Sequence, residues 1–160
     1  MRWRFSAQLH AVKNIELMPE IQITDANRDA IMSGNMCPYC GCPTKYVDSI
    51  RVYKVRSYGM VYVCFNCDAW VGTHKSSTRA LGRLANAELR LWKRMAHDAF
   101  DPIWKAQEAA GTPKYIARTE IYKWLSGAMG IDPRYTHIGM FGVEQCQAVI
   151  ELCKHYNPIL

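Results

Sequence analysis

The sequence predicts a mixed α+β fold, in which a zinc ribbon precedes about four helices. A zinc ribbon is a three-stranded antiparallel sheet held by its metal ion. Two observations lead to this prediction. Two C-x-x-C pairs, Cys37/Cys40 and Cys64/Cys67, flank a run of β-branched and aromatic residues. After Thr78, apolar residues recur at helical spacing through most of the remaining chain.

The two cysteine pairs carry the metal prediction. A C-x-x-C turn lets two thiolates reach one ion, and two such turns at one end of a hairpin offer four thiolates in a near-tetrahedral array. We therefore predict one structural zinc ion bound by Cys37, Cys40, Cys64 and Cys67. A disulfide framework is disfavoured, because Met1–Asn14 contains no continuous apolar segment of a secretory signal. A thioredoxin-like redox motif would be a single pair at the start of a helix.

Three further cysteines remain. Cys42 follows the first pair closely enough to compete as a ligand, although its side chain should leave the turn on the other face. Cys146 and Cys153 lie seven residues apart in a helical stretch. We interpret them as small buried hydrophobic residues.

Composition limits the classes of function. The 160 residues carry a formal net charge of +6 and have a pI near 9.0. A basic zinc protein favours nucleic acid or another polyanion as its partner. No apolar run approaches the ~18 residues of a membrane span, and reduced, metal-bound cysteines predict a cytoplasmic location. We expect no small-molecule substrate.

The chain divides into three predicted parts. Residues 1–34 form an N-terminal arm with a short helix, residues 35–75 the zinc ribbon, and residues 76–160 a helical region that shares one core with the ribbon. The opening MRWRF segment alternates basic and aromatic residues. It predicts a strand packed on the rest of the chain, or else an arm that touches nucleic acid.

Turn and cap residues place the individual elements. A short helix occupies Thr24–Ser33, with Thr24 or Asp25 as its N-cap. The strands are predicted at Lys45–Lys54, Met60–Val63 and Ala69–Val71. The helices are predicted at Arg79–Phe100 after N-cap candidates at residues 76–78, and at Pro102–Ala109, Tyr115–Met129 and Val143–His155.

Basic residues on the first long helix form the candidate nucleic-acid surface. The predicted contacts to phosphate are Arg79, Arg83, Arg90, Lys93 and Arg94. A solvated helix face is the alternative, but such a face would more often include acidic residues. The ribbon offers aromatic rings that could stack on bases, at Tyr39, Tyr46, Tyr58 and Phe65, although packing against the small sheet is the expected role for most of them.

An enzymatic role is disfavoured. The His97-Asp98 dipeptide is one part of a metal phosphohydrolase centre, which needs further His and Asp ligands such as His74, Asp101 or His137. His74 is better explained as a turn cap or as a second-shell support of the zinc ligands. His137 is better explained as fixing its own turn. We find no nucleophile elbow, Walker loop or dinucleotide-binding loop.

An ordered series of sequence blocks carries a family resemblance. These blocks are CPYCG, YG..YVC..C.AWVGTH, LGRLAN..LR, AH..FDP.W and HIGMF before a Cys-containing helix. Over about Thr24 to Tyr156, the chain resembles a small family of bacterial and phage proteins known as zinc-finger-containing domains of unknown function. The resemblance implies a zinc-ribbon fold and a phage or prophage context, and it implies no reaction.

Two functions of different classes follow. The first is a non-catalytic protein that binds nucleic acid, DNA or RNA, through the basic helix face. The alternative is an adaptor or inhibitor that acts on a host or phage protein of replication, transcription or defence. Salt dependence separates the two classes, because contacts to phosphate weaken steeply as salt is added.

Overall fold

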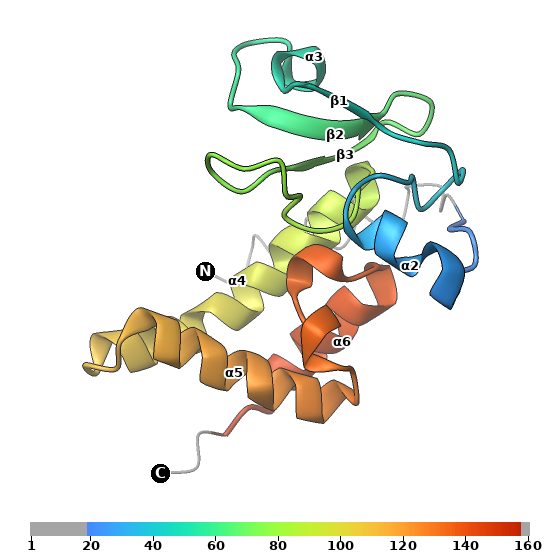
Figure 1. Ribbon diagram of the computed structural model, residues 1–160. Coiled ribbons are helices and arrows are strands. Elements are labelled where there is room, and N and C mark those ends of the chain that lie inside the picture. Colours follow the sequence, from blue (N-terminus) through green and yellow to red (C-terminus); the bar gives the residue numbers. More distant parts are fainter. Residues whose placement is uncertain (1–18, 158–160) are drawn as a thin grey trace. The chain divides into compact units, whose positions relative to one another are not determined.

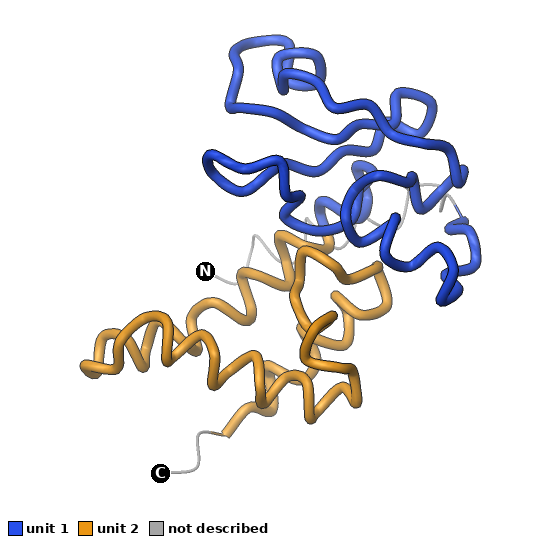
Figure 2. Tube along the Cα trace, viewed as in Figure 1, with its two compact units in different colours: residues 1–91 blue, residues 92–160 orange. Residues whose placement is uncertain are grey.

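The computed structural model describes residues 19–157 (Figure 1). The chain forms two compact units, residues 1–91 and residues 92–160 (Figure 2). The MRWRF segment lies outside the described residues. Within the described part of the chain, no helix has both the length and the apolar character that a membrane span requires.

The first unit contains the predicted sheet. Its strands β1 (Lys45–Asp48), β2 (Met60–Cys64) and β3 (Ala69–Gly72) are antiparallel and lie in the order β1-β2-β3. Tyr46 on β1 pairs with Tyr62 on β2, and the two ring centroids lie 4.9 Å apart. Such cross-strand aromatic pairs stabilise a small sheet. Together with the helices, this sheet confirms the mixed α+β fold.

The connection between β1 and β2 differs from the prediction. A strand over Lys45–Lys54 was expected, but β1 ends at Asp48 and a short helix, α3 (Ile50–Tyr53), follows it. The Asp48 carboxylate accepts hydrogen bonds from the Ile50 backbone N–H and the Ser57 hydroxyl, both at 2.8 Å. These bonds favour a turn over a continued strand. The ribbon therefore has a helical turn at its tip.

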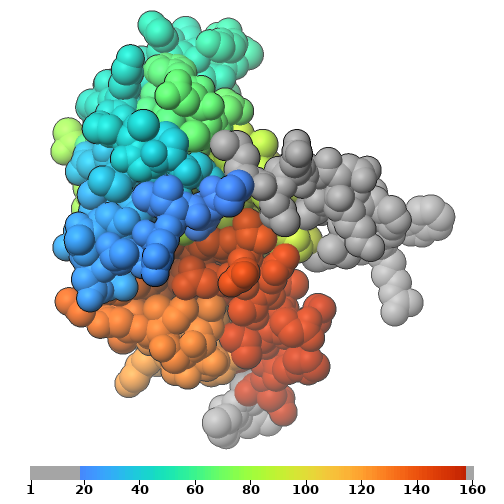
Figure 3. All heavy atoms as spheres, turned by 90° about the vertical axis from the view of Figure 1, so that its right-hand side faces the viewer, coloured from blue at the N-terminus to red at the C-terminus, as the bar shows by residue number. Residues whose placement is uncertain are grey.

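The helix α2 (Asp25–Met32) leads into the first cysteine pair and confirms the short predicted helix. The Thr24 backbone N–H donates to the Asn27 side-chain oxygen at 2.7 Å, which closes the start of the helix. Just before it, the Ile21 N–H donates to the Pro38 carbonyl at 2.8 Å. This bond ties the segment to the first cysteine turn, and Figure 3 shows the two (blue and cyan) side by side.

The long helix α4 (Ala87–Ala109) begins later than predicted. The chain from Arg79 was expected to be helical. Instead, Ala85 and Trp70 exchange two backbone hydrogen bonds of 3.1 Å along the outer edge of β3. Asn86 is the actual N-cap, because its side-chain oxygen accepts the N–H of the third helical residue at 2.9 Å. Leu84 and Ala85, which suggested the apolar face of a helix, are buried here in a non-helical edge segment.

The prediction of a separate helix at Pro102–Ala109 is also wrong. The helix α4 continues through Pro102, which lacks the N–H that would bond one turn back. Phe100 and Trp104 on either side are both buried. Their burial offsets the missing hydrogen bond and keeps the helix continuous.

The second unit is completed by α5 (Lys114–Met129), two 3-10 turns at Pro133–Tyr135 and Ile138–Met140, and α6 (Val143–Lys154). Both α5 and α6 agree with the prediction within one residue at each end. The core of this unit consists of large apolar side chains. Among them are Phe100, Ile121, Leu125, Ile138, Phe141 and Val149.

Candidate metal centre

The four predicted ligands converge at one end of the ribbon. Cys37 and Cys40 come from the loop between α2 and β1, Cys64 is the last residue of β2, and Cys67 lies in the turn before β3. Their Sγ atoms all lie within 4.8 Å of one another, and those of Cys40 and Cys64 are 3.6 Å apart. A ZnS₄ tetrahedron with Zn–S bonds of about 2.3 Å has edges of about 3.8 Å. The donor set therefore fits one zinc ion.

Backbone geometry holds each pair in a tight turn. In the first pair, the Gly41 N–H donates to the Cys37 carbonyl at 2.9 Å, and the Cys37 N–H donates to the Cys42 carbonyl at 2.9 Å. Gly41 has a φ of +70°, which glycine adopts at little cost. Asp68 takes the corresponding place after the second pair, with a φ of +47°. Aspartate is among the residues that tolerate this region best.

The thiols have strongly perturbed acidities. Burial raises the pKa of Cys37 to about 11 and raises that of Cys67 further. A hydrogen bond from the Cys42 backbone lowers the pKa of Cys40 to about 7. Four thiolates this close repel one another, so they ionise together only when a cation compensates their charge. Zinc supplies that charge.

Apolar side chains surround the cysteines. Tyr39, Ala69 and Leu84 are buried against them. The Tyr39 hydroxyl accepts the Asn86 N–H at 3.1 Å, and burial raises the pKa of Tyr39 to about 12. Tyr39 therefore connects the first cysteine turn to the start of α4. Its ring is not available for stacking on a base.

The other sulfur and imidazole candidates are not members of this four-cysteine cluster. Cys42 is exposed, and its thiol donates to the Cys40 carbonyl at 3.8 Å. Cys146 is buried as predicted, whereas Cys153 is half-buried. His74 is exposed in the loop after β3, where its backbone closes a turn with Arg79. Its second-shell role at zinc stays a prediction.

Two of the predicted phosphate contacts have structural roles instead. Arg83 is only 2% exposed and pairs with the Glu20 carboxylate at 2.7 Å. Arg90 lies over the Trp70 ring, 3.3 Å from its centroid, and donates to the Asp68 carbonyl at 3.2 Å. Arg90 thus holds the second cysteine turn and the β3 edge. The Arg83 guanidinium is therefore not accessible to a phosphate backbone, whereas that of Arg90 is partly exposed but already engaged.

The remaining members of that set do not form the expected helix face. Arg79 is exposed but precedes α4, and the Lys93 ammonium donates to the Gly139 carbonyl at 2.6 Å. Arg94 is exposed on α4. The five basic residues were predicted to share one helix from Arg79 onward. That prediction is wrong, because Arg79 and Arg83 precede α4. In addition, the side chains of Arg83, Arg90 and Lys93 each bind another group of the protein.

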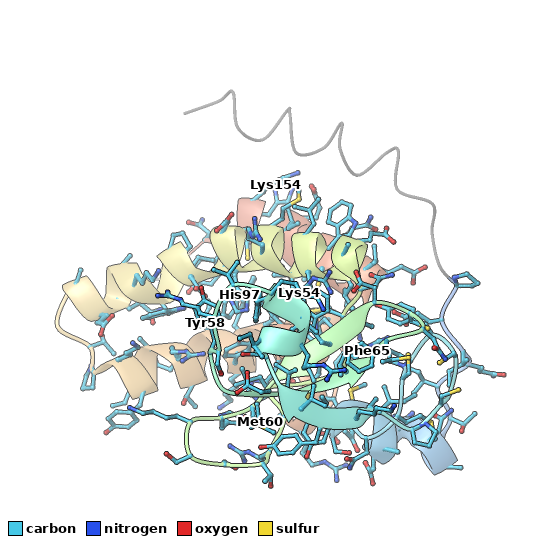
Figure 4. All side chains as sticks on the ribbon, turned by 90° about the horizontal axis from the view of Figure 1, so that it is seen from above. Lys54, Tyr58, Met60, Phe65, His97 and Lys154 are labelled. Atoms are coloured by element: carbon cyan, nitrogen blue, oxygen red, sulfur yellow. The ribbon has the colours of Figure 1, made fainter. Side chains whose placement is uncertain are left out.

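The ribbon tip presents the cations that the sequence interpretation missed. Arg51 lies over the Phe65 ring at 5.7 Å from the centroid, and Arg56 over the Tyr58 ring at 4.6 Å. Seen from above, Lys54 lies between Tyr58 and Phe65 (Figure 4). The signal was present in the stretch RVYKVRSY, which alternates cations and aromatic rings.

A groove of about 640 Å³ adjoins this tip. The hairpin side contributes the rings of Tyr46, Tyr53 and Tyr58, and the loop after β3 contributes His74 and Lys75. Tyr53 and Tyr58 contact each other edge to face, with centroids 5.1 Å apart. The groove therefore combines aromatic side chains with one cationic side chain, Lys75.

The His97-Asp98 dipeptide does not assemble a second metal site. The His97 ring pairs with Asp101 at 3.3 Å, and the same carboxylate accepts the Trp104 indole N–H at 3.1 Å. Asp98 is exposed. Among residues 19–157, the four-cysteine cluster is the one group positioned to bind a metal ion.

Comparison with known proteins agrees with this centre. A family model described as a zinc-finger-containing domain matches residues 33–156, which include all four cysteines and most of the chain. No curated protein matches the chain. No solved structure matches it either.

Proposed function

We propose that this chain, which belongs to the family of zinc-finger-containing domains, binds nucleic acid through its ribbon without catalysis. The contact region is the aromatic–basic surface, which we define as Arg51, Tyr53, Lys54, Arg56, Tyr58 and Phe65, together with the adjoining groove. It replaces the helix face that the sequence suggested. We place this activity in the cytoplasm, in a phage or prophage context.

One observation carries the proposal. Arg51 and Arg56 each lie over an exposed aromatic ring, so cations and π-faces alternate along one stretch of surface. Proteins that bind single-stranded nucleic acid use this combination, because bases stack on the rings while cations follow the phosphates. Tyr58 is 62% exposed, so much of its ring is accessible to a base.

Local charge supports the same conclusion. Between residues 45 and 79, Asp48 and Asp68 are the acidic residues. Asp48 already accepts two hydrogen bonds, and Asp68 pairs with Arg90 at 3.8 Å. The basic residues of this stretch are Lys45, Arg51, Lys54, Arg56, Lys75 and Arg79, and all are exposed. The positive charge of the ribbon is therefore largely uncompensated on its surface.

The test is binding of the full, zinc-loaded chain to labelled single-stranded and duplex DNA and RNA. We expect single strands to bind best. Contact with about four phosphates would weaken binding about 50-fold between about 50 mM and about 200 mM salt. Tyr58→Ala should cost about 1–3 kcal/mol of binding free energy, since it removes one stacking platform.

Charge variants localise the contact. The double variant Arg51→Ala/Arg56→Ala should weaken binding and reduce its salt dependence. The control Arg134→Ala/Lys154→Ala removes the same charge from the second unit and should leave binding unchanged. Equal losses in the two double variants would indicate non-specific attraction and would contradict the proposed surface.

A protein partner is the second candidate, and one observation favours it. Val55 at the ribbon tip is 83% exposed and Ile50 is 45% exposed, and neither side chain is needed for contact with phosphate. Exposed apolar residues at a tip are typical of protein contacts. If no nucleic acid binds at low salt, the adaptor or inhibitor role becomes the better hypothesis, and crosslinking through Val55→Cys would identify the partner.

A further inference from the structure

The second unit contains a pocket of about 610 Å³ between α5 and the segment that follows it. Four of its lining residues lie on one face of α5, at Tyr115, Arg118, Tyr122 and Lys123, because residues three, four, seven and eight apart share a helix face. The opposite wall includes His137. This volume is within the range of small-molecule sites, about 300–1,000 Å³.

The inner wall of the pocket is aromatic. The rings of Tyr122 and His137 contact each other with centroids 4.9 Å apart and an angle of 56° between their planes. Burial and the nearby Arg118 charge lower the pKa of His137, so its imidazole is neutral at pH 7. Phe100 packs on the Tyr122 ring with centroids 4.6 Å apart, so the accessible aromatic surface of the pocket comes from the His137 imidazole and the exposed Tyr115 ring.

The polar part of the lining is cationic. Arg118 and Lys123 line the pocket, and none of its lining residues is acidic. Arg118 also lies over the Trp104 ring at 5.6 Å from the centroid, together with Lys114 at 5.3 Å and Lys105 at 5.5 Å. Three cations around one indole repel one another, and a bound anion would reduce that repulsion.

We propose that this pocket binds a nucleoside monophosphate, with the base against Tyr115 and His137 and the phosphate at Arg118 and Lys123. Inorganic phosphate alone would leave the aromatic wall without a partner. An uncharged aromatic compound would leave the positive charges of Arg118 and Lys123 without an anion. The planar guanidinium of Arg118 suits two oxygens of one phosphate. The ligand is either a free nucleotide or the phosphorylated end of a strand.

The first measurement is calorimetric titration of the full, zinc-loaded chain with AMP, GMP, CMP and UMP, and with adenosine and inorganic phosphate for comparison. We expect at least one monophosphate to bind at a single site. Adenosine and phosphate should each bind at least about tenfold more weakly, because each lacks one half of the contacts.

Variants assign the binding to this pocket. Arg118→Gln and Lys123→Gln should each weaken monophosphate binding by about tenfold or more, since each removes a charged contact. Lys123→Gln tests binding without a change in folding, because Lys123 is exposed and its loss should not disturb the fold. Lys154→Gln removes the same charge from α6 and should bind as the original chain does. Shifts of the His137 ring resonances on titration would report contact with the aromatic wall.

The outcomes separate this inference from the proposed function of the ribbon. If the double variant Arg51→Ala/Arg56→Ala binds free monophosphates as well as the original chain does, the nucleotide site is independent of the ribbon. Preference for a 5′-phosphorylated over a 5′-hydroxyl oligonucleotide, lost in Lys123→Gln, supports a strand end as the ligand. The proposal would be overturned if neither free monophosphates nor 5′-phosphorylated ends were bound. It would also be overturned if Lys123→Gln, Arg118→Gln and Lys154→Gln bound monophosphate equally well.

Discussion

The two units of this protein hold their structures by different means. The first has strands of four or five residues, and the centre of its ribbon is a cluster of cysteines lined by Tyr39, Ala69 and Leu84. The second buries large apolar side chains such as Phe100, Phe141 and Leu125. Because so small a sheet buries little apolar area, zinc binding contributes much of the folding free energy of the ribbon. The second unit relies on packing.

The difference has a functional consequence. Because the ribbon does not need its aromatic residues for a core, Tyr46, Tyr53, Tyr58 and Phe65 remain at least partly exposed. In the second unit, Phe100 and Phe141 are fully buried. The metal-held ribbon thus displays four aromatic rings and buries Tyr39, whereas the packed unit buries Phe100 and Phe141 and displays Tyr115.

The largest expected effect is loss of a zinc ligand. Cys64→Ser removes one of four thiolates at the end of β2, so zinc affinity should fall severely and the ribbon should unfold, a loss on the order of 10 kcal/mol. Hydrogen exchange should become fast at residues 45–72 and stay slow at residues 114–154. Metal analysis gives the zinc content directly.

Cys153→Ser is the matched control. This cysteine is half-buried on α6 and belongs to the packed unit, so the variant should retain one equivalent of zinc and slow exchange in the ribbon. A full equivalent of zinc in Cys64→Ser would contradict the four-cysteine site.

Acidification should release the metal. In the metal-free site, burial raises the pKa of Cys37 to about 11 and raises that of Cys67 further, so both thiols are protonated below pH 8. Zinc binding must displace these protons, so its affinity falls as pH falls, by about a hundredfold per pH unit for two protons. Competition with a chelator at several pH values measures this slope. A slope of about tenfold per unit would show that only one thiol ionises on binding.

The ligand set was predictable from sequence because its chemistry is local. C-x-x-C followed by a residue that tolerates positive φ specifies the turn, as Gly41 and Asp68 show. The bounds of α5 and α6 were predictable for a similar reason, since each combines helical periodicity with clear end signals. These predictions need no knowledge of distant residues.

The start of α4 and the fate of the arginines were not predictable in this way. Ala85 pairs with the edge of β3, so its environment depends on a residue fifteen positions away, Trp70. Arg83 is buried because it meets Glu20, which no local pattern indicates. Arg83 is thus buried, and Arg90 is engaged by Trp70 and Asp68 while it stays partly exposed. Tertiary pairing outweighed the periodicity and the charge pattern together.

Truncation of a buried aromatic residue should affect only the second unit. Phe141→Ala leaves a cavity where the ring is fully buried, and it should lower the free energy of unfolding by about 3–5 kcal/mol. Zinc content should not change. Denaturant unfolding measures the loss, and hydrogen exchange locates it in residues 114–154.

The same substitution in the ribbon gives the contrast. Phe65 is 45% exposed, so Phe65→Ala should change stability by less than about 1 kcal/mol, although it should weaken nucleic-acid binding. If Phe65→Ala destabilised the protein as much as Phe141→Ala, the ribbon would have an apolar core of its own, and the contrast between the two units would be wrong.

The smallest expected effect concerns Asn86, which begins α4 at the end of the first unit. Its side-chain oxygen accepts the Leu89 N–H at 2.9 Å, while its own N–H donates to the Tyr39 hydroxyl. Asn86→Ala removes the first bond and keeps the second, so it should cost about 1 kcal/mol. Asn86→Ser should recover most of this loss, because serine also caps helices well. Denaturant unfolding of both variants compares them, and equal losses would mean that burial of the Asn86 side chain, and not its hydrogen bond, stabilises the start of α4.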